Sequence, residues 1–217
     1  MDRLTLIIAN RNYSSWSMRA WLALKATGAH FDEELVALGR PETRAEILKW
    51  SPTGRLPALH DGGVVIWDSL AICEHLAERF PDAGLWPQEQ PARAAARSVV
   101  AEMHAGFMAL RSHMPMNLRA SRPGAGGGPG VDEDVRRVVE IWESCRRDFG
   151  AGGDLLFGGF TIADAFYAPV ISRFLTYGIE PGGAAGEYMA AVWALPAVVE
   201  WAEAARTEGM TVARYET

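Results

Sequence analysis

The N-terminal part of the chain places an apolar strand directly before a helix, and this order restricts the chain to folds that begin with an α/β unit. The run Leu4–Ala9 is apolar enough to form a buried strand. A helical pattern follows over about residues 16–27, and Gly28 suits the C-terminal end of that helix. The loop between them carries three serines, so hydroxyl groups lie where the strand passes into the helix.

Ser14 and Ser15 are the candidate functional residues of this loop. The first turn of a helix has unpaired N–H groups and the positive end of the helix dipole, which favour an anion. A hydroxyl in that environment can donate a hydrogen bond to a thiolate or a carboxylate. The structural alternative is that one serine simply caps the helix. The neighbouring Tyr13 is a third hydroxyl that could serve the same purpose, and the loop alone does not choose among them.

The α/β pattern continues to about residue 80. A short strand is predicted over 31–35 and a short helix over 43–50. The apolar segments 56–59 and 64–67 flank a turn with two glycines, which predicts a β-hairpin. A helix is expected to begin near Asp68 and Ser69. The predicted order of elements is β-α-β-α-β-β-α.

The composition changes after this unit. Residues 81–91 contain three prolines and form a predicted linker, and every later element is predicted to be helical. The expected organisation is an α/β domain over 1–80, the linker 81–91 and an all-helical domain over 92–217. The predicted helices of the second domain cover residues 91–117, 132–149, 161–177 (with Pro169 predicting a kink) and 196–206, and the glycine-rich segment 121–130 is a predicted loop.

Charge and cysteine content exclude several classes of function. The net charge of −6 and the pI of about 5.4 argue against nucleic-acid binding, which needs a basic face. No apolar run approaches the ~20 residues that span a bilayer, and the N-terminus lacks a secretory signal, so a cytoplasmic location is expected. Cys73 and Cys145 occupy apolar positions of helical patterns, which predicts buried, reduced thiols. No histidine or cysteine spacing indicates a metal site.

Leu56 and Pro57 form a second notable motif. Proline cannot donate to the hydrogen-bond ladder of a sheet, so Pro57 requires an edge position or a cis peptide bond. A cis bond would turn the backbone of Leu56 outward, where it could pair with an extended peptide ligand.

Asp68 and Ser69 form a third motif, at the predicted start of a helix. Capping of that helix would explain both residues. In the functional interpretation, Ser69 receives a carboxylate and Asp68 an ammonium group, the two charges of an α-amino acid. A fourth motif, Thr161 followed by Asp164, is a variant capping box to which we assign a folding role only.

These four motifs, in this order and at these separations, resemble the cytosolic glutathione transferase superfamily over nearly the whole chain. The resemblance implies a thioredoxin-like N-terminal domain that binds glutathione, followed by an all-helical domain that contributes a more variable acceptor site. It also implies a homodimer, a cis Pro57, and glutathione as the co-substrate with no metal. The positions that match the family pattern are Ser14 or Ser15 for the glutathione sulfur, Leu56 (before Pro57) for the cysteinyl backbone, Asp68 and Ser69 for the γ-glutamyl end, and Arg55 for the glycyl carboxylate.

The serine loop looks most like the serine-type classes, and the zeta class in particular, where Ser-Ser-Cys stands at this place. That alignment favours Ser14 over Ser15 and identifies the chain as a serine-type bacterial member. Trp16 replaces the zeta cysteine, which weakens the case for zeta-type isomerase chemistry. The expected activity is attack of a glutathione thiolate on a small hydrophobic electrophile. The alternatives are a zeta-type isomerase and a transferase-fold protein that binds or regulates without turnover.

The acceptor site is the least determined part of the prediction. Met108, Arg111, Arg173 and Tyr177 are its candidate residues, since all four fall on predicted helices of the second domain. Core packing or a solvated helix face is the preferred explanation for them. Arg173 would favour an anionic acceptor if it pointed inward. The residues do not identify the electrophile or its pathway.

Overall fold

A four-stranded sheet forms the core of the N-terminal part of the protein. The computed structural model describes residues 3–216, and its strands are β1 (Leu4–Ala9), β2 (Phe31–Val36), β3 (Ala58–Asp61) and β4 (Val64–Ile66). They lie in the order β2-β1-β3-β4. β1 pairs in parallel with β2 and antiparallel with β3, and β4 pairs antiparallel with β3. The hairpin begins two residues later than predicted at its first strand, because Pro57 has no N–H to donate.

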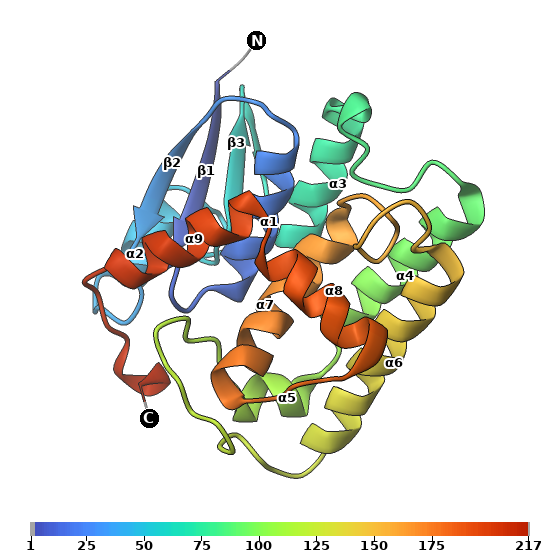
Figure 1. The fold of residues 1–217 in the computed structure, drawn as a ribbon. Coiled ribbons are helices and arrows are strands. Elements are labelled where there is room, and N and C mark those ends of the chain that lie inside the picture. Colours follow the sequence, from blue (N-terminus) through green and yellow to red (C-terminus); the bar gives the residue numbers. More distant parts are fainter. Residues whose placement is uncertain (1–2, 217) are drawn as a thin grey trace.

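Three helices cover this sheet on both faces, α1 (Ser15–Ala26), α2 (Thr43–Leu48) and α3 (Ser69–Arg79) (Figure 1). Side chains of a strand alternate between faces, and β1 follows this rule. Leu6 and Ile8 are fully buried in the main core together with residues of α1 and α3. Ile7 is buried in a separate small cluster with Ile47 of α2. A thioredoxin-like domain of this kind confirms the predicted fold class.

The rest of the described chain is helical, as predicted. Its elements are η1 (Pro81–Ala83), α4 (Gln90–Ala105), α5 (Met108–His113), α6 (Val131–Phe149), α7 (Ile162–Tyr177), α8 (Gly183–Trp193), α9 (Pro196–Thr207) and η2 (Ala213–Tyr215). α7 is buried on nearly all sides, which is typical of a central core helix. Its first turn carries the predicted capping box, in which Thr161 and Asp164 satisfy each other's backbone N–H groups.

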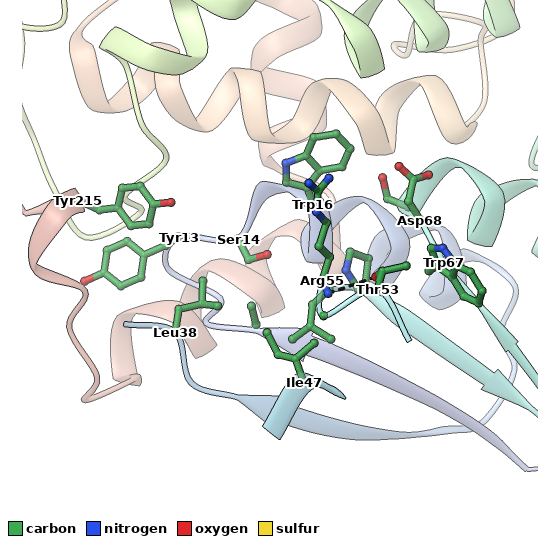
Figure 2. Close-up of a pocket in the computed structure, with 15 residues that line it drawn as sticks. Tyr13, Ser14, Trp16, Leu38, Ile47, Thr53, Arg55, Trp67, Asp68 and Tyr215 are labelled. Atoms are coloured by element: carbon green, nitrogen blue, oxygen red, sulfur yellow. Dashed lines mark hydrogen bonds between the residues drawn. The ribbon is translucent and has the colours of Figure 1, made fainter. Parts of the chain in front are cut away.

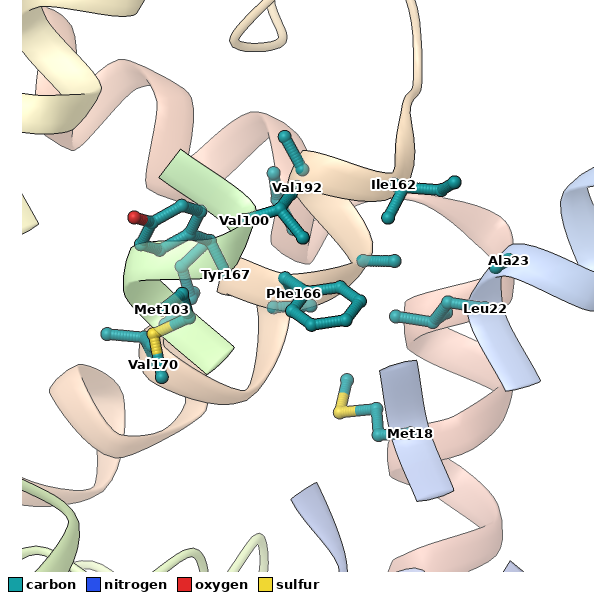
Figure 3. Packing of buried hydrophobic residues seen from close by; sticks show 14 of the residues in the cluster. Met18, Leu22, Ala23, Val100, Met103, Ile162, Phe166, Tyr167, Val170 and Val192 are labelled. Atoms are coloured by element: carbon teal, nitrogen blue, oxygen red, sulfur yellow. The ribbon is translucent and has the colours of Figure 1, made fainter. Parts of the chain in front are cut away.

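The two halves of the molecule meet where α1 packs on α7. Met18 and Leu22 project from α1 towards Phe166 of α7, while Val100 and Met103 of α4 cover the other side of α7 (Figure 3). All five side chains are fully buried or nearly so. Because α1 begins at the serine loop, this packing fixes the loop relative to the helical half.

The prediction of a single helix over 91–117 is wrong, since Gly106 and Phe107 separate two helices, α4 and α5. Gly106 ends α4, and a Cβ at this position would lie 2.8 Å from the carbonyl oxygen of Glu102. Phe107 then takes a left-handed conformation with φ of 58° and buries its ring. The backbone N–H of Leu110 in α5 donates to Oδ2 of Asp134 over 2.9 Å. That acceptor comes from α6, so the break depends on a tertiary contact.

Helix α8 was not predicted, because residues 182–186 at its start include three glycines, a composition typical of a loop. It forms because Tyr188 and Val192 bury completely against the core. Cys73 and Cys145 are buried free thiols, as predicted. Beyond α9, residues 208–216, which we term the C-terminal strap, return to the N-terminal half and end beside the loop that precedes α1 (Figure 1).

Candidate functional site

A pocket of about 730 Å³ opens at the end of β1, where the start of α1 faces the start of α3. Figure 2 shows Ser14 near its middle, Asp68 and Trp67 towards one end, and Tyr13 and Tyr215 towards the other. The structure therefore brings together residues from three separate predicted motifs. The lining residues are Ala9, Tyr13, Ser14, Trp16, Leu38, Ile47, Thr53, Gly54, Arg55, Leu56, Pro57, Trp67, Asp68, Ser69 and Tyr215.

Ser14 is both the N-cap of α1 and a lining residue of the pocket. Its Oγ accepts a hydrogen bond from the backbone N–H of Ser17 over 3.2 Å and donates to the Oγ of Ser17 over 2.8 Å. The Ser17 hydroxyl in turn accepts from the backbone N–H of Ala9 over 3.0 Å. This chain of bonds fixes the Ser14 hydroxyl at the positive end of the helix dipole. Ser15 is the first residue of α1, is buried, and does not line the pocket.

The hydroxyl of Tyr13 is hydrogen-bonded to the C-terminal strap. It donates to the carboxylate of Glu216 and accepts from Nη2 of Arg119 over 2.7 Å. The same hydrogen bond from Tyr13 is the main reason that the pKa of the Glu216 carboxyl is lowered, with smaller contributions from Asn117 and Arg119. The Tyr13 ring stacks on Tyr215 with centroids 5.5 Å apart. Tyr13 therefore forms an aromatic wall of the pocket, and its hydroxyl proton is already donated to Glu216.

The segment before β3 forms the floor of the pocket between its two ends. The peptide bond between Leu56 and Pro57 is cis, as the motif and the family resemblance predicted. Pro57 is buried, Leu56 is half-buried, and Arg55 is exposed at the rim.

Asp68 and Ser69 lie where α3 begins. Asp68 is the N-cap residue, and its Oδ1 accepts from the backbone N–H of Leu70 over 2.9 Å. Its Oδ2 lies 3.1 Å from Nε2 of His104, on α4. Ser69 is fully buried, and its Oγ has no hydrogen-bond partner within the described residues. An unpaired buried hydroxyl is costly, and this one belongs to a residue that lines the pocket.

The four predicted acceptor residues lie outside the lining of this pocket. Met108 is exposed to solvent, with 62% of its surface accessible. Arg111 stacks on Trp16, with its guanidinium carbon 5.3 Å from the ring centroid. Arg173 is buried and donates to the carbonyl oxygens of Met114 and Pro169, both over 2.9 Å. The Tyr177 hydroxyl donates to the carbonyl oxygen of Pro115 over 3.3 Å.

Trp16 separates the pocket from a group of buried cations. The guanidinium of Arg19 lies between Trp16 and Phe166, 4.6 Å and 4.8 Å from the two ring centroids. Its Nε and Nη1 have no hydrogen-bond partner within residues 3–216. Burial lowers the pKa of Arg19 well below its ordinary value, and the nearby Arg111 and Arg173 lower it further. Trp16 thus packs at the junction of the two halves.

Sequence reasoning did not identify Tyr215, Trp67 and Thr53 as lining residues, nor His104 as the partner of Asp68. No local pattern marks Tyr215, since its position depends on the path of the C-terminal strap. Trp67 directly precedes the Asp68 motif, and that adjacency was the only available signal. Within the part of the chain that the structure describes, no group of three His, Cys, Asp or Glu side chains could hold a metal ion. No helix there is long and apolar enough to cross a membrane.

The fold and the pocket define a class of protein, and the comparison with family models agrees with it. Residues 13–79 match the glutathione S-transferase N-terminal domain, and residues 90–204 match the glutathione S-transferase C-terminal domain. The chain belongs to the glutathione S-transferase family.

Within this family the chain is distantly similar to the zeta class. A probable maleylacetoacetate isomerase of Caenorhabditis elegans is 28% identical over 165 residues, which cover 74% of each chain. Glutathione S-transferase Z2 of Arabidopsis thaliana is 27% identical over 164 residues, which cover 73% of this chain and 71% of its own. A solved glutathione transferase homologue from Burkholderia, with bound glutathione, has a TM-score of 0.70 at 23% identity and covers 95% of this chain and 99% of its own.

Proposed function

We propose that this protein is a serine-type glutathione transferase in which Ser14 stabilises the thiolate of glutathione. The observation that carries this proposal is the convergence of Ser14, the Leu56 backbone and the Asp68–Ser69 pair on one pocket. These groups follow one another along the pocket, as an extended γ-glutamyl peptide requires. Glutathione bound to the Burkholderia homologue, which shares this fold, is consistent with that ligand.

Each lining motif has a role in this proposal. Asp68 receives the ammonium of the γ-glutamyl group, and the unpaired hydroxyl of Ser69 donates to its carboxylate. The backbone of Leu56, next to the cis Pro57, pairs with the cysteinyl residue. The exposed Arg55 at the rim attracts the glycyl carboxylate.

Ser14 acts in the chemical step as a hydrogen-bond donor and not as a base. A free thiol has a pKa of about 8.5, so it is mostly protonated at neutral pH. A bound sulfur that replaces Ser17 Oγ as the acceptor of the Ser14 proton would gain a hydrogen bond and the favourable field of the α1 N-terminus. Both effects lower the pKa of the thiol. The thiol proton passes to solvent, and the thiolate attacks an electrophilic carbon to form the new S–C bond. With a halide or an epoxide the electrons of the broken bond leave with the halide or the epoxide oxygen; with an activated alkene the π electrons move onto the acceptor, which then takes a proton from solvent.

One alternative has specific support, and a second is compatible with the same pocket. The name of the Caenorhabditis elegans relative, a probable maleylacetoacetate isomerase, favours a zeta-type isomerase. Against this stands Trp16, which occupies the position of the cysteine in the zeta motif. A protein that binds glutathione without turnover would keep the same pocket. Assembly as a homodimer is a further proposal that follows from family membership.

The test begins with purified protein and glutathione alone, measured by calorimetry. Binding followed by turnover of halogenated aromatic, epoxide and activated-alkene electrophiles supports the transferase. Binding with turnover of maleylacetoacetate alone supports the isomerase, and binding without any turnover supports the regulatory alternative. Absence of glutathione binding contradicts the whole proposal. Sedimentation velocity on the same sample tests the homodimer.

A further inference from the structure

The carboxylate of Asp68 is held by both halves of the molecule. Its Oδ1 is fixed within the N-terminal half by the backbone N–H of Leu70. Its Oδ2 lies 3.1 Å from Nε2 of His104, in the last turn of α4 in the helical half. Even so, 46% of the Asp68 side chain is accessible and it lines the pocket. The carboxylate is therefore oriented on one side and open to a ligand on the other.

The ring of His104 is itself held in place by aromatic neighbours. It meets Trp16 edge-on, with the ring centroids 5.1 Å apart. Phe166 of α7 lies on another side, at 6.1 Å. Since Trp16 lines the pocket and Phe166 belongs to the core, His104 is wedged between the site and the helical half. Its Nε2 has little freedom to leave Asp68.

The surroundings of His104 define which nitrogen carries the proton. Nδ1 is buried without a hydrogen-bond partner in the described chain, so an N–H at Nδ1 would be buried and unsatisfied. A proton on Nε2 instead faces the Asp68 carboxylate, whose Oδ2 lies 3.1 Å away. Burial lowers the pKa of His104, and Arg19 and Arg111 lower it too, against the opposing effect of Asp68. The ring is consequently a neutral donor at neutral pH.

We propose that His104 is a positioning residue for ligand recognition: it holds Oδ2 of Asp68 and so directs the carboxylate to the ammonium of a γ-glutamyl ligand. A neutral donor suits this task because it orients Asp68 without cancelling its negative charge. A lysine or arginine at the same place would compete with the ligand's own cation. The inference rests on the proposed function, in which Asp68 receives the ammonium group.

The test compares two ligands that differ only in that ammonium group. They are glutathione and its desamino analogue glutaryl-cysteinylglycine, each titrated calorimetrically against the full-length protein. His104→Phe keeps a ring to pack on Trp16 but removes the donor. We expect it to weaken glutathione binding by about tenfold, the scale of one close polar contact with a charged group, and to change binding of the analogue by less than about twofold.

Two matched variants separate positioning from packing. His104→Gln places an amide N–H near the position of Nε2 and should restore most of the affinity for glutathione. Asp68→Asn should remove the preference for glutathione over the analogue, and adding His104→Phe to it should cause no further loss. Binding of the analogue also shows that each variant is folded.

Equal weakening of both ligands by His104→Phe would overturn the inference, since it would indicate a purely structural role. Unchanged affinity for glutathione in that variant would also overturn it. Failure of the unaltered protein to bind glutathione is a different result, because it contradicts the proposed function itself.

Discussion

Removal of the Ser14 hydroxyl is the most direct perturbation of the proposed chemistry. Ser14→Ala takes away the donor expected to face the sulfur, and a hydrogen bond to a charged group contributes about 1.5–3 kcal/mol. One pKa unit corresponds to about 1.4 kcal/mol, so the pKa of the bound thiol should rise by about one to two units. For a thiol that returns to a pKa of about 8.5, the thiolate fraction at neutral pH, and the rate of the chemical step with it, should then fall by about 8- to 25-fold.

The same substitution has a separate and smaller effect on folding. Ser14 caps α1 and accepts from the backbone N–H of Ser17, and loss of such a cap costs about 1 kcal/mol. Glutathione binding should be largely retained, because the Leu56 backbone and the Asp68–Ser69 pair are untouched. Calorimetry therefore reports binding, while the ultraviolet absorbance of the thiolate as a function of pH reports its pKa.

Two neighbouring hydroxyls provide matched controls for Ser14→Ala. Ser15→Ala removes a buried hydroxyl that does not line the pocket, and it should leave the thiol pKa unchanged. Tyr13→Phe removes a hydroxyl that is already bound to Glu216 and Arg119, with the same expected result. A thiol pKa that stays unchanged in Ser14→Ala but rises in either control would refute the assignment of Ser14.

Three further predictions concern stability and the C-terminal strap. Burial raises the pKa of Cys145 to about 11 and that of Cys73 further, so neither thiol should react with a thiol reagent until the protein unfolds; labelling of the native protein would contradict this. Burial also raises the folded-state pKa of Asp164 to about 6 from 3.8. The neutral carboxyl therefore stabilises the fold fully below about pH 4, and this stabilisation is lost by about pH 6. The free energy of unfolding should fall by about 3 kcal/mol across that range. Urea unfolding of the wild type against Asp164→Asn measures that fall, and parallel pH profiles would argue against it. Arg119→Gln removes the donors to the carbonyl oxygens of Glu208 and Met210 in the strap. Hydrogen exchange in residues 208–216 should then become more than about tenfold faster while exchange in α7 is unchanged. Equal exchange in the two proteins would show that other contacts hold the strap.

Local patterns in the sequence were sufficient to predict the N-terminal architecture. The strand–loop–helix order at Leu4–Ala9, the proline at position 57 and the cap at Asp68 each depend on neighbouring residues only. Burial of β1 on both faces follows from its apolar composition. The cis bond before Pro57 was also expected, although the resemblance to a known family was needed to choose it over a trans bond.

Contacts between distant residues decided the features that were missed. The break between α4 and α5 depends on a carboxylate that α6 supplies through Asp134, and α8 is stabilised by burial of Tyr188. Both contradict local propensity, because tertiary packing outweighs the small preferences of single residues. Arg173 was assigned to the acceptor site from its place on a helix, but a helix position alone does not reveal which face is buried.

In the serine loop, too, local sequence determined some features and tertiary contacts determined others. The sequence by itself placed three adjacent hydroxyls at a helix start, beside motifs for a γ-glutamyl peptide. The family resemblance favoured Ser14 over Ser15, and the tertiary structure separated all three: Ser14 lines the pocket, Ser15 is buried and does not line it, and the Tyr13 hydroxyl is bonded to a strap from the far end of the chain. The physical reason is that helix geometry sets the directions of neighbouring side chains, whereas the pocket is built by residues as remote in sequence as Pro57 and Tyr215.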